Sequence, residues 1–423
     1  MEPIRLEKAP ARRWYALLMN ALAYGYFFMT INIINSMTGE VQTAFGISMT
    51  QLTFLTTAVM IAFAVVPTIG AQIAAKIGGR NIVTLAIFWN VAVTLLFLIP
   101  VVTQSYTATL ILRFLHGVTG GLMTGTVVGS TPLWFPVRER GIASGLNLGI
   151  LGVGFAVDQF FSPKLLAMGL SWANTMVLML VVPGIIMGLV YYLTMRDIKD
   201  LYGVFAVAEA LPPDVSTNDA DGPVIESQDQ RPATMAEAFK SKVFWATAVY
   251  GFVNGWVVYG FTAFLPSILT NDVGITGTTA TNIISATFFV TFVASPLGGI
   301  ISDKVFNGKR YQLLFLGCLL TVVTLISIPN LSSVGIVAVM FILAYGSTSI
   351  VCGVFWTVPT EIVQPAISVK SSASIMTVAN IGGVIAAPIL VSVTSFTGSN
   401  SASTTICIAL AVLAAISALI IKR

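Results

Sequence analysis

Long apolar runs separated by short polar segments make up most of this chain of 423 residues. Each run is about 20 residues long, and as a helix it crosses a hydrocarbon core about 30 Å thick. A helix also satisfies its own backbone hydrogen bonds inside a membrane. The pattern therefore predicts an all-α polytopic membrane protein with twelve transmembrane helices, at approximately residues 14–36, 51–73, 81–103, 107–131, 141–163, 171–194, 243–268, 281–302, 311–329, 334–356, 371–394 and 404–421.

The composition agrees with this class, because 56% of the residues are hydrophobic and only 9% are charged. Soluble proteins carry about 25% charged residues. Little polar sequence lies outside the runs, so we expect no soluble catalytic domain. The charged start of the chain leads directly into the first run, without the short apolar core and small-residue cleavage site of a secretory signal. We therefore expect the first helix to stay in the protein.

The basic residues predict the orientation of the helices. Of the 21 Lys and Arg residues, all but Arg113 and Lys164 lie at the chain ends, in the long middle segment or in the loops of one predicted side. Basic loops stay in the cytoplasm, so we expect a multi-pass protein of the plasma or inner membrane with both termini cytoplasmic. This distribution explains the net charge of +4 without a nucleic-acid partner.

The long polar segment after the sixth run divides the chain. Its prolines stand among acidic residues, which makes the segment too polar to form a core. We therefore expect an N-terminal six-helix bundle at residues 1–195, a cytoplasmic linker loop at 196–242 and a C-terminal six-helix bundle at 243–423. Near the end of the linker, Thr234 and Glu237 have the spacing of a helix capping box.

The two predicted bundles share an internal repeat. Phe45-Gly-Ile-Ser-Met-Thr50 recurs 228 residues later as Val273-Gly-Ile-Thr-Gly-Thr278, and Arg140-Gly-Ile-Ala-Ser144 matches Lys370-Ser-Ser-Ala-Ser374 at an offset of 230. Parallel repeats of this kind occur in secondary transporters, where two bundles surround a substrate site near the middle of the membrane. The repeat therefore predicts two similar halves.

Loop motifs in both halves resemble those of the major facilitator superfamily. The superfamily's loop signature, with a glycine, an aspartate and basic residues at fixed spacing, is similar to the segment Gly299–Arg310, which has one extra residue. In the first half the signature is reduced to Lys76, Gly78 and Arg80, because Ala75 replaces the aspartate. The resemblance covers nearly the whole chain except the middle loop.

Two further motifs support the resemblance. Arg113 with Gly117 and Gly121 is similar to the superfamily's fourth-helix Arg-x-x-x-Gly pattern. The triplets Trp134-Phe135-Pro136 and Phe264-Leu265-Pro266 resemble branches that carry organic anions. Those branches often place an arginine in the first span, and this chain has none there.

The resemblance implies that the loop charges control conformation. The superfamily uses the loop aspartate in a cytoplasmic charge network that locks the outward-open state. The alanine at position 75 then implies that the lock is not symmetric. We expect conformational gating by the charged residues of these loops, namely Lys76, Arg80, Arg140, Asp303, Lys304 and Arg310.

Three ionisable residues lie inside predicted spans, where such groups are costly and usually functional. Arg113 and the single histidine, His116, are three residues apart and share a helix face. Asp158 is the one carboxylate well inside a span, at a depth similar to that of Arg113. We expect proton coupling at Asp158 and substrate binding by Arg113 and His116. A permanent structural pair of Arg113 and Asp158, with His116 packed and neutral, is the alternative.

Uncharged polar and aromatic residues near the middle of the spans complete the predicted substrate site. In the resembled superfamily the first, fourth, seventh and tenth spans line the cavity, which favours residues on those spans. Each of these residues could equally anchor a contact between helices. The candidates are Tyr24, Asn254, Tyr259, Tyr345 and Asn380.

The sequence favours a secondary active transporter that moves a small hydrophilic metabolite by alternating access, with an organic anion as the candidate substrate class and protons as the coupling ion. The chain has no GxxxxGK[ST] loop for ATP. It also has no Gly-x-Ser-x-Gly elbow and no second histidine. We therefore expect no enzymatic activity, no cofactor and no metal. A polytopic membrane enzyme, a channel or a non-transporting sensor is the alternative.

The expected partners follow from this function. They are a small-molecule substrate, H+ and the lipid bilayer, and we expect the protein to work as a monomer.

Overall fold

The computed structural model of the protein describes residues 4–99, 104–212, 231–257, 269, 274–275, 277–327, 334–398 and 400–422. All regular elements in these ranges are helices, as the sequence predicted. The long helices of the first half are α1 (Arg12–Ser36), α3 (Met49–Val65), α4 (Pro67–Ile77), α5 (Gly79–Phe97), α7 (Tyr106–Ser130), α8 (Arg140–Ala167) and α10 (Val182–Thr194). Its short elements are α2 (Thr38–Phe45), η1 (Thr131–Trp134), η2 (Val137–Glu139), α9 (Trp172–Met176), η3 (Val177–Val181), α11 (Ile198–Tyr202) and η4 (Val207–Ala210).

The second half has the same kind of elements. Its long helices are α14 (Lys242–Gly255), α16 (Gly277–Ile300), α17 (Arg310–Ser327), α18 (Val334–Phe355), α20 (Ser368–Thr397) and α21 (Asn400–Ile420). Its short elements are α13 (Met235–Ala238), η8 (Ile301–Val305), α19 (Val358–Glu361) and η10 (Pro365–Ile367).

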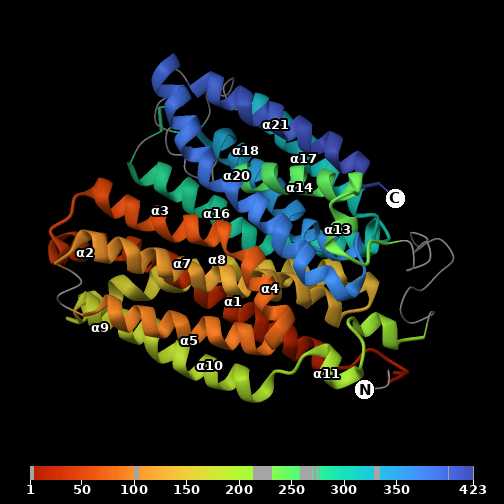
Figure 1. Ribbon diagram of the computed structural model, residues 1–423. Coiled ribbons are helices and arrows are strands. Elements are labelled where there is room, and N and C mark those ends of the chain that lie inside the picture. Colours follow the sequence, from red (N-terminus) through yellow and green to blue (C-terminus); the bar gives the residue numbers. More distant parts are fainter. Residues whose placement is uncertain are drawn as a thin grey trace.

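The helices form two bundles that lie side by side (Figure 1). The helix pairs that pack together follow the internal repeat: α1 packs against α8 as α14 packs against α20, and α3 packs against α7 as α16 packs against α18. Between the bundles, α8 packs against α16 and α20 packs against α3, which are equivalent pairs under the repeat. The two halves therefore use their matching sequences for matching contacts.

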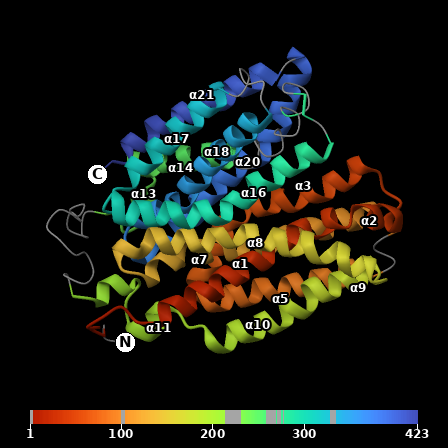
Figure 2. The same ribbon diagram turned by 180° about the vertical axis from the view of Figure 1, so that it is seen from behind.

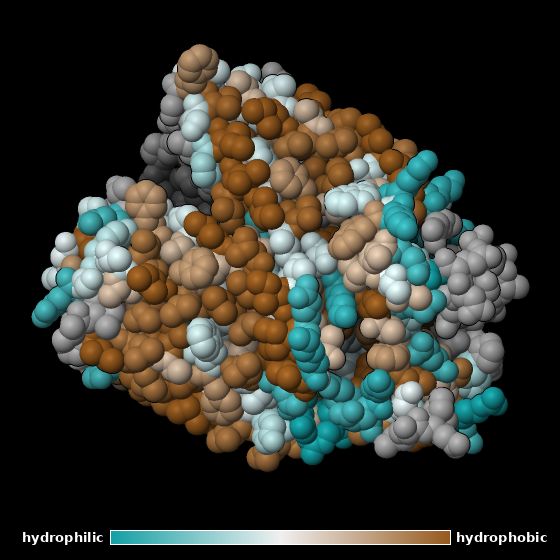
Figure 3. Space-filling model, viewed as in Figure 1, coloured by the Kyte–Doolittle hydropathy of each residue, from teal (hydrophilic) through white to brown (hydrophobic). Residues whose placement is uncertain are grey.

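Nine helices of the described residues are long and apolar enough to span a membrane. A tenth span results if α3 and α4 are counted together, although they are bent by 52°. The predicted count of twelve is not confirmed, because α14 and α16, which correspond to the predicted spans 243–268 and 281–302, are not among these spans. Large apolar side chains such as Phe54, Ile186 and Val323 are more than half exposed. Figure 3 shows apolar surface of this kind over both bundles, as expected for contact with lipid.

Both chain ends lie at the same end of the bundles, near α11 and α13 (Figures 1 and 2). We call this end the terminus side. The opposite side carries α2 and α9. The shared position of the two ends is consistent with an even number of membrane crossings.

The start of the predicted linker packs against the first bundle. Ala206, Val207 and Ala210 are buried, η4 contacts η1, and the N–H of Leu6 donates to the carbonyl of Ala210 at 2.8 Å. This part of the linker contains enough apolar residues to cover the terminus side of the bundle. The first half therefore extends structurally beyond the predicted boundary at residue 195.

The end of the linker begins α13 with the predicted N-cap. The hydroxyl of Thr234 accepts from the N–H of Glu237 at 3.2 Å. The carboxylate of Glu237 accepts from the N–H of Ala233 at 2.9 Å. Hydrogen bonds from Ala233 and Thr234 lower the pKa of Glu237. The capping residues are thus the two that the sequence indicated.

Asp197 ties the end of α10 to the start of α5. Its carboxylate accepts from the N–H of Gly79 at 2.9 Å and from the N–H of Arg80 at 3.0 Å. The first N–H groups of a helix have no intrahelical acceptor, and a negative charge there is favourable. Asp197 therefore stabilises the terminus side of the first bundle.

The substitution Asp197→Ala is expected to lower the free energy of unfolding by about 1 kcal/mol, because two N–H groups of α5 lose their acceptor. The midpoint of thermal unfolding in detergent measures this effect. Asp200→Ala removes an exposed carboxylate of the same segment and serves as the matched control with a smaller expected effect. Equal midpoints for the two variants would show that the cap does not contribute.

Candidate functional site

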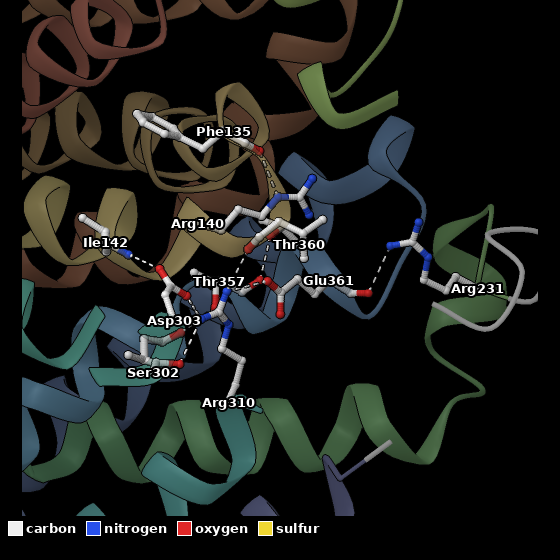
Figure 4. A network of polar contacts seen from close by, with 12 residues as sticks. Phe135, Arg140, Ile142, Arg231, Ser302, Asp303, Arg310, Thr357, Thr360 and Glu361 are labelled. Carbon is white, nitrogen blue, oxygen red and sulfur yellow. Dashed lines mark hydrogen bonds and ion pairs between the residues drawn. The ribbon is translucent and has the colours of Figure 1, made fainter. Parts of the chain in front are cut away.

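The two bundles are joined on the terminus side by charged and backbone groups (Figure 4). Asp303 in η8 accepts a hydrogen bond of 2.8 Å from the backbone N–H of Ile142 in α8. The same carboxylate forms an ion pair with Arg310 at the start of α17. Arg310 also donates to the carbonyl of Val137 in η2 at 3.2 Å. Asp303 and Arg310 of the second bundle therefore both hold the start of α8 and the loop before it.

Glu361 in α19 extends this network within the second bundle. Its Oε1 lies 3.3 Å from Nη2 of Arg310, and its carbonyl accepts from Arg231 at 3.3 Å. Arg140 is buried beside the network and donates through Nε to the backbone carbonyl of residue 135 at 3.4 Å. Three of the predicted gating residues therefore meet at one place.

The ionised form of Asp303 depends on its neighbours. Burial raises the pKa of this carboxyl, while the charge and hydrogen bond of Arg310 and the N–H of Ile142 lower it. Removing one partner of a buried ion pair costs about 3–5 kcal/mol, because the other charge is left unpaired. The contact between the bundles therefore relies on the pairing of Asp303 with Arg310.

The other predicted gating residues lie outside this network. Lys76 and Lys304 are exposed, and the guanidinium of Arg80 lies over the ring of Tyr192 at 5.0 Å. The repeat places Ala75 opposite Asp303, so the first bundle has no carboxylate at the equivalent position. The observed network uses the loop motif of the second half alone.

The contact between α8 and α16 loosens away from the terminus side. A Cβ added to Gly145 would lie 2.5 Å from the carbonyl of Ser295. At Gly149 the nearest atom is the carbonyl of Phe292 at 3.4 Å, and at Gly152 it is the side chain of Phe292 at 3.9 Å. These glycines cover about 10 Å of helix. The two helices are therefore in close contact on the terminus side and diverge toward the opposite side.

Arg113 lies inside the first bundle and is fully buried. Its Nη1 donates to the carbonyl of Thr30 at 3.1 Å, and its Nη2 donates to the carbonyl of Ile31 at 2.9 Å. These carbonyls belong to the second-last turn of α1, which ends at Ser36. Nε of Arg113 has no hydrogen-bond partner. Arg113 therefore holds the end of α1 against α7.

His116 packs against polar and aromatic groups of α5. Its Nε2 lies 3.1 Å from the hydroxyl oxygen of Thr94, and that hydroxyl also lies 2.8 Å from the carbonyl of Asn90. Nδ1 of His116 has no hydrogen-bond partner. The ring packs edge-on against Phe97 of α5 at 5.7 Å. His116 thus faces the interior of the first bundle.

Asp158 does not form the ion pair with Arg113 that their similar depths allowed, because neither residue takes part in an ion pair of the described part of the chain. Asp158 is fully buried. It accepts from Nδ2 of Asn32 at 2.9 Å and from the hydroxyl of Ser162 at 2.7 Å, and the hydroxyl of Ser36 lies 3.0 Å away. The last two turns of α1 therefore contact Arg113 from α7 and Asp158 from α8.

Three uncharged candidates lie within the bundles. Tyr24 is buried in α1 and packs edge-on against Phe28 at 4.9 Å. Tyr345 is buried in α18. Asn254 lines a cavity of about 30 Å³ between α14, α17, α18 and α21. Asn254 therefore borders the interior of the second bundle.

Asn380 has a different environment, because it lies on the surface where the bundles meet. Its Nδ2 in α20 donates to the carbonyl of Phe63 in α3 at 3.1 Å. Tyr259, the remaining candidate, lies outside the described residues.

Three partners of Asp158 were not identified from the sequence. Ser162 follows Asp158 by one helical turn, and this spacing could have indicated it. Asn32 and Ser36 are also one turn apart, but nothing in the sequence shows which neighbour their face of α1 contacts. Within the described residues, no group of three His, Cys, Asp or Glu side chains could hold a metal ion.

Comparison with known proteins gives one family match and several similar proteins. The family model of the Major Facilitator Superfamily matches residues 20–387. The chain is 20% identical over 360 residues to the "Probable sulfoacetate transporter SauU" of Cupriavidus necator, covering 82% of this chain and 80% of that protein. It is 23% identical over 337 residues to the "Probable nitrate/nitrite antiporter NarK1" of Thermus thermophilus, covering 78% and 70%.

The fold is similar to that of a solved transporter structure. The proton:xylose symporter XylE superposes with a TM-score of 0.77 at 13% sequence identity, covering 96% of this chain and 95% of that one. At this identity the similarity concerns the fold alone.

The substitution Arg113→Gln is expected to lower the free energy of unfolding by about 2 kcal/mol or more in the absence of substrate, because two charge-assisted hydrogen bonds to α1 are lost. Thermal unfolding in detergent measures this. Lys164→Gln removes an exposed cation of the same bundle and is the control, with an expected change within about 0.5 kcal/mol. Unchanged stability of the Arg113→Gln variant would rule out this structural role.

Proposed function

Because the chain belongs to the Major Facilitator Superfamily, we propose that it is a secondary active transporter that carries a small hydrophilic metabolite across the membrane by alternating access. The observation that supports this proposal is that the two bundles are in contact on the terminus side and separate toward the opposite side. Asp303 and Ile142 join them on the terminus side, whereas α8 and α16 diverge toward the opposite side. One state of a carrier whose bundles rock about a central site has this form.

The terminus side is cytoplasmic in this proposal. The basic residues of the chain ends and of the loops on that side support this orientation, because positively charged loops stay in the cytoplasm. The structure then corresponds to an outward-facing state, in which the space between the bundles is reached from outside the cell.

We propose a small organic anion as the substrate. The names of the relatives SauU and NarK1 refer to anions, sulfoacetate and nitrate or nitrite. In this chain Arg113 is a cation at membrane depth that forms no ion pair among the described residues. Its positive charge favours the approach of an anion to the first bundle. Because Arg113 itself is enclosed, we assign it long-range attraction rather than direct contact.

Asp158 is suited to carry the coupled proton. Its close partners are an amide and two hydroxyls. These groups donate to the ionised carboxylate, and the hydroxyls can rotate to accept from the protonated acid. Two of the partners belong to α1, whose neighbouring turn is held by Arg113. A change in protonation therefore acts on the packing of α1, a helix that contacts both α7 and α8.

Uptake into proteoliposomes tests the function. With sulfoacetate as the probe and an inward proton gradient, we expect saturable uptake that exceeds the equilibrium level and stops when the gradient is dissipated. Uptake that never exceeds equilibrium under any gradient would contradict coupled transport.

The substitution Asp158→Asn is expected to abolish gradient-driven accumulation while exchange of preloaded substrate continues, because the amide cannot carry a proton but keeps a hydrogen-bonding side chain in place. Asp197→Asn is the matched control, since it removes a carboxylate that caps a helix, and its accumulation should resemble that of the unchanged protein. Full accumulation by the Asp158→Asn variant would assign the coupled proton to another group.

A further inference from the structure

The second span of the first bundle breaks at a proline. α3 ends at Val65, α4 begins at Pro67, and the two helices are bent by 52°. Proline has no N–H and cannot donate to the carbonyl four residues earlier. The carbonyl of Phe63 therefore lacks its usual helical donor.

Asn380 supplies the missing donor from the other bundle. Its Nδ2 donates to the carbonyl of Phe63 at 3.1 Å, and Asn380 is only 4% exposed. The amide oxygen could not replace the nitrogen, because two acceptors do not form a hydrogen bond. An unpaired carbonyl at membrane depth is costly, so this contact stabilises the packing of α20 on α3.

A second hydrogen bond between the bundles lies one turn away. The hydroxyls of Thr68 in α4 and Thr377 in α20 are 2.9 Å apart. The repeat offset of 230 places Ile150 opposite Asn380, and isoleucine has no polar group to donate. The donor from α20 is therefore specific to this one of the two equivalent interfaces.

The depth of the contact connects it with the closure of the terminus side. Pro67 is ten residues from Ile77 at the end of α4, or about 15 Å along the helix, which is near the middle of the membrane. If the terminus side opened, α20 would separate from α3 and water could pair with the carbonyl of Phe63. The hydrogen bond from Asn380 is then needed only while the terminus side is closed.

We propose that Asn380 is a positioning residue that favours the closed terminus side by pairing with the carbonyl freed by Pro67, and that it is not a substrate ligand. This inference rests on the alternating access proposed above. According to this inference, replacing Asn380 affects closure of the terminus side only when Pro67 is present. If Asn380 bound the substrate, its replacement would have the same effect with or without Pro67.

The accessibility of a reporter thiol measures the equilibrium between the closed and the open terminus side. Ser144 in α8 is 3% exposed, and its hydroxyl has no hydrogen-bond partner, so Ser144→Cys is a suitable reporter. The full chain would carry it after replacement of its native cysteines, Cys318, Cys352 and Cys407. A membrane-impermeant thiol reagent applied to the terminus side then reports opening without requiring any substrate.

Asn380→Leu is expected to raise the labelling rate about tenfold, because the unpaired carbonyl of Phe63 destabilises the closed state alone. Adding Pro67→Ala restores the helical N–H, and the rate is expected to return close to its original value. Pro296→Ala, which alters another proline of the interface, is not expected to restore it. Thr68→Val removes the neighbouring hydroxyl contact without freeing a carbonyl and is expected to have a much smaller effect.

Asn380→Ala tests the same point if the leucine variant does not fold. If either Asn380 variant raises the labelling rate and Pro67→Ala does not lower it again, the inference is overturned. It is also overturned if an Asn380 variant loses sulfoacetate binding while the labelling rate stays the same. Asp303→Asn, which weakens the contact with Ile142, is the positive control. If no variant, including Asp303→Asn, changes the labelling, alternating access itself fails and the inference fails with it. If Asp303→Asn alone changes it, only the role of Asn380 is wrong.

Discussion

Polar groups at membrane depth need hydrogen-bond partners inside the protein, and these hydrogen bonds determine how the helices of this protein pack. Arg113 pairs with the carbonyls of α1. Asp158 pairs with side chains of α1 and α8. The carbonyl freed by Pro67 pairs with an amide of the other bundle. In each case the hydrogen bond fixes the position of one helix relative to another. Apolar packing alone would not fix it, because an apolar helix surface contacts lipid as favourably as it contacts another helix.

The same requirement distinguishes the two ends of the molecule. On the terminus side, a carboxylate, an arginine and two backbone groups join the bundles. Farther along α8 the distance to α16 grows. The charged groups at membrane depth belong to the first bundle, whereas the described contacts of the second bundle at this depth involve uncharged groups such as Asn380. A proton taken up at depth would therefore act first on the first bundle and reach the second through their shared surface.

The sequence predicted the helical class and the superfamily, which are confirmed, together with two related halves and gating by loop charges, which stay predictions. These features follow from apolar run lengths, an internal repeat and short motifs. The hydrogen-bond partners of Arg113 and Asp158 could not be predicted, because residue spacing gives depth along a helix but not the rotation of the helix about its axis. The two residues share a similar depth, yet α1 supplies partners to both. The cap formed by Asp197 was missed for a related reason, since its acceptor role depends on where α5 begins in space. Residues 204–211 were assigned to a linker because prolines and acidic residues dominate the segment as a whole.

The most direct test is a pair of distance measurements on one protein population. Spin labels at the exposed residues Lys76 and Lys304 report the terminus side, and labels at the exposed residues Thr43 and Phe396 report the opposite side. Double electron–electron resonance would record both distances before and after acidification with sulfoacetate. Alternating access predicts that the terminus-side distance grows while the opposite-side distance shrinks. Two distances that change in the same direction, or that do not change at all, would contradict it.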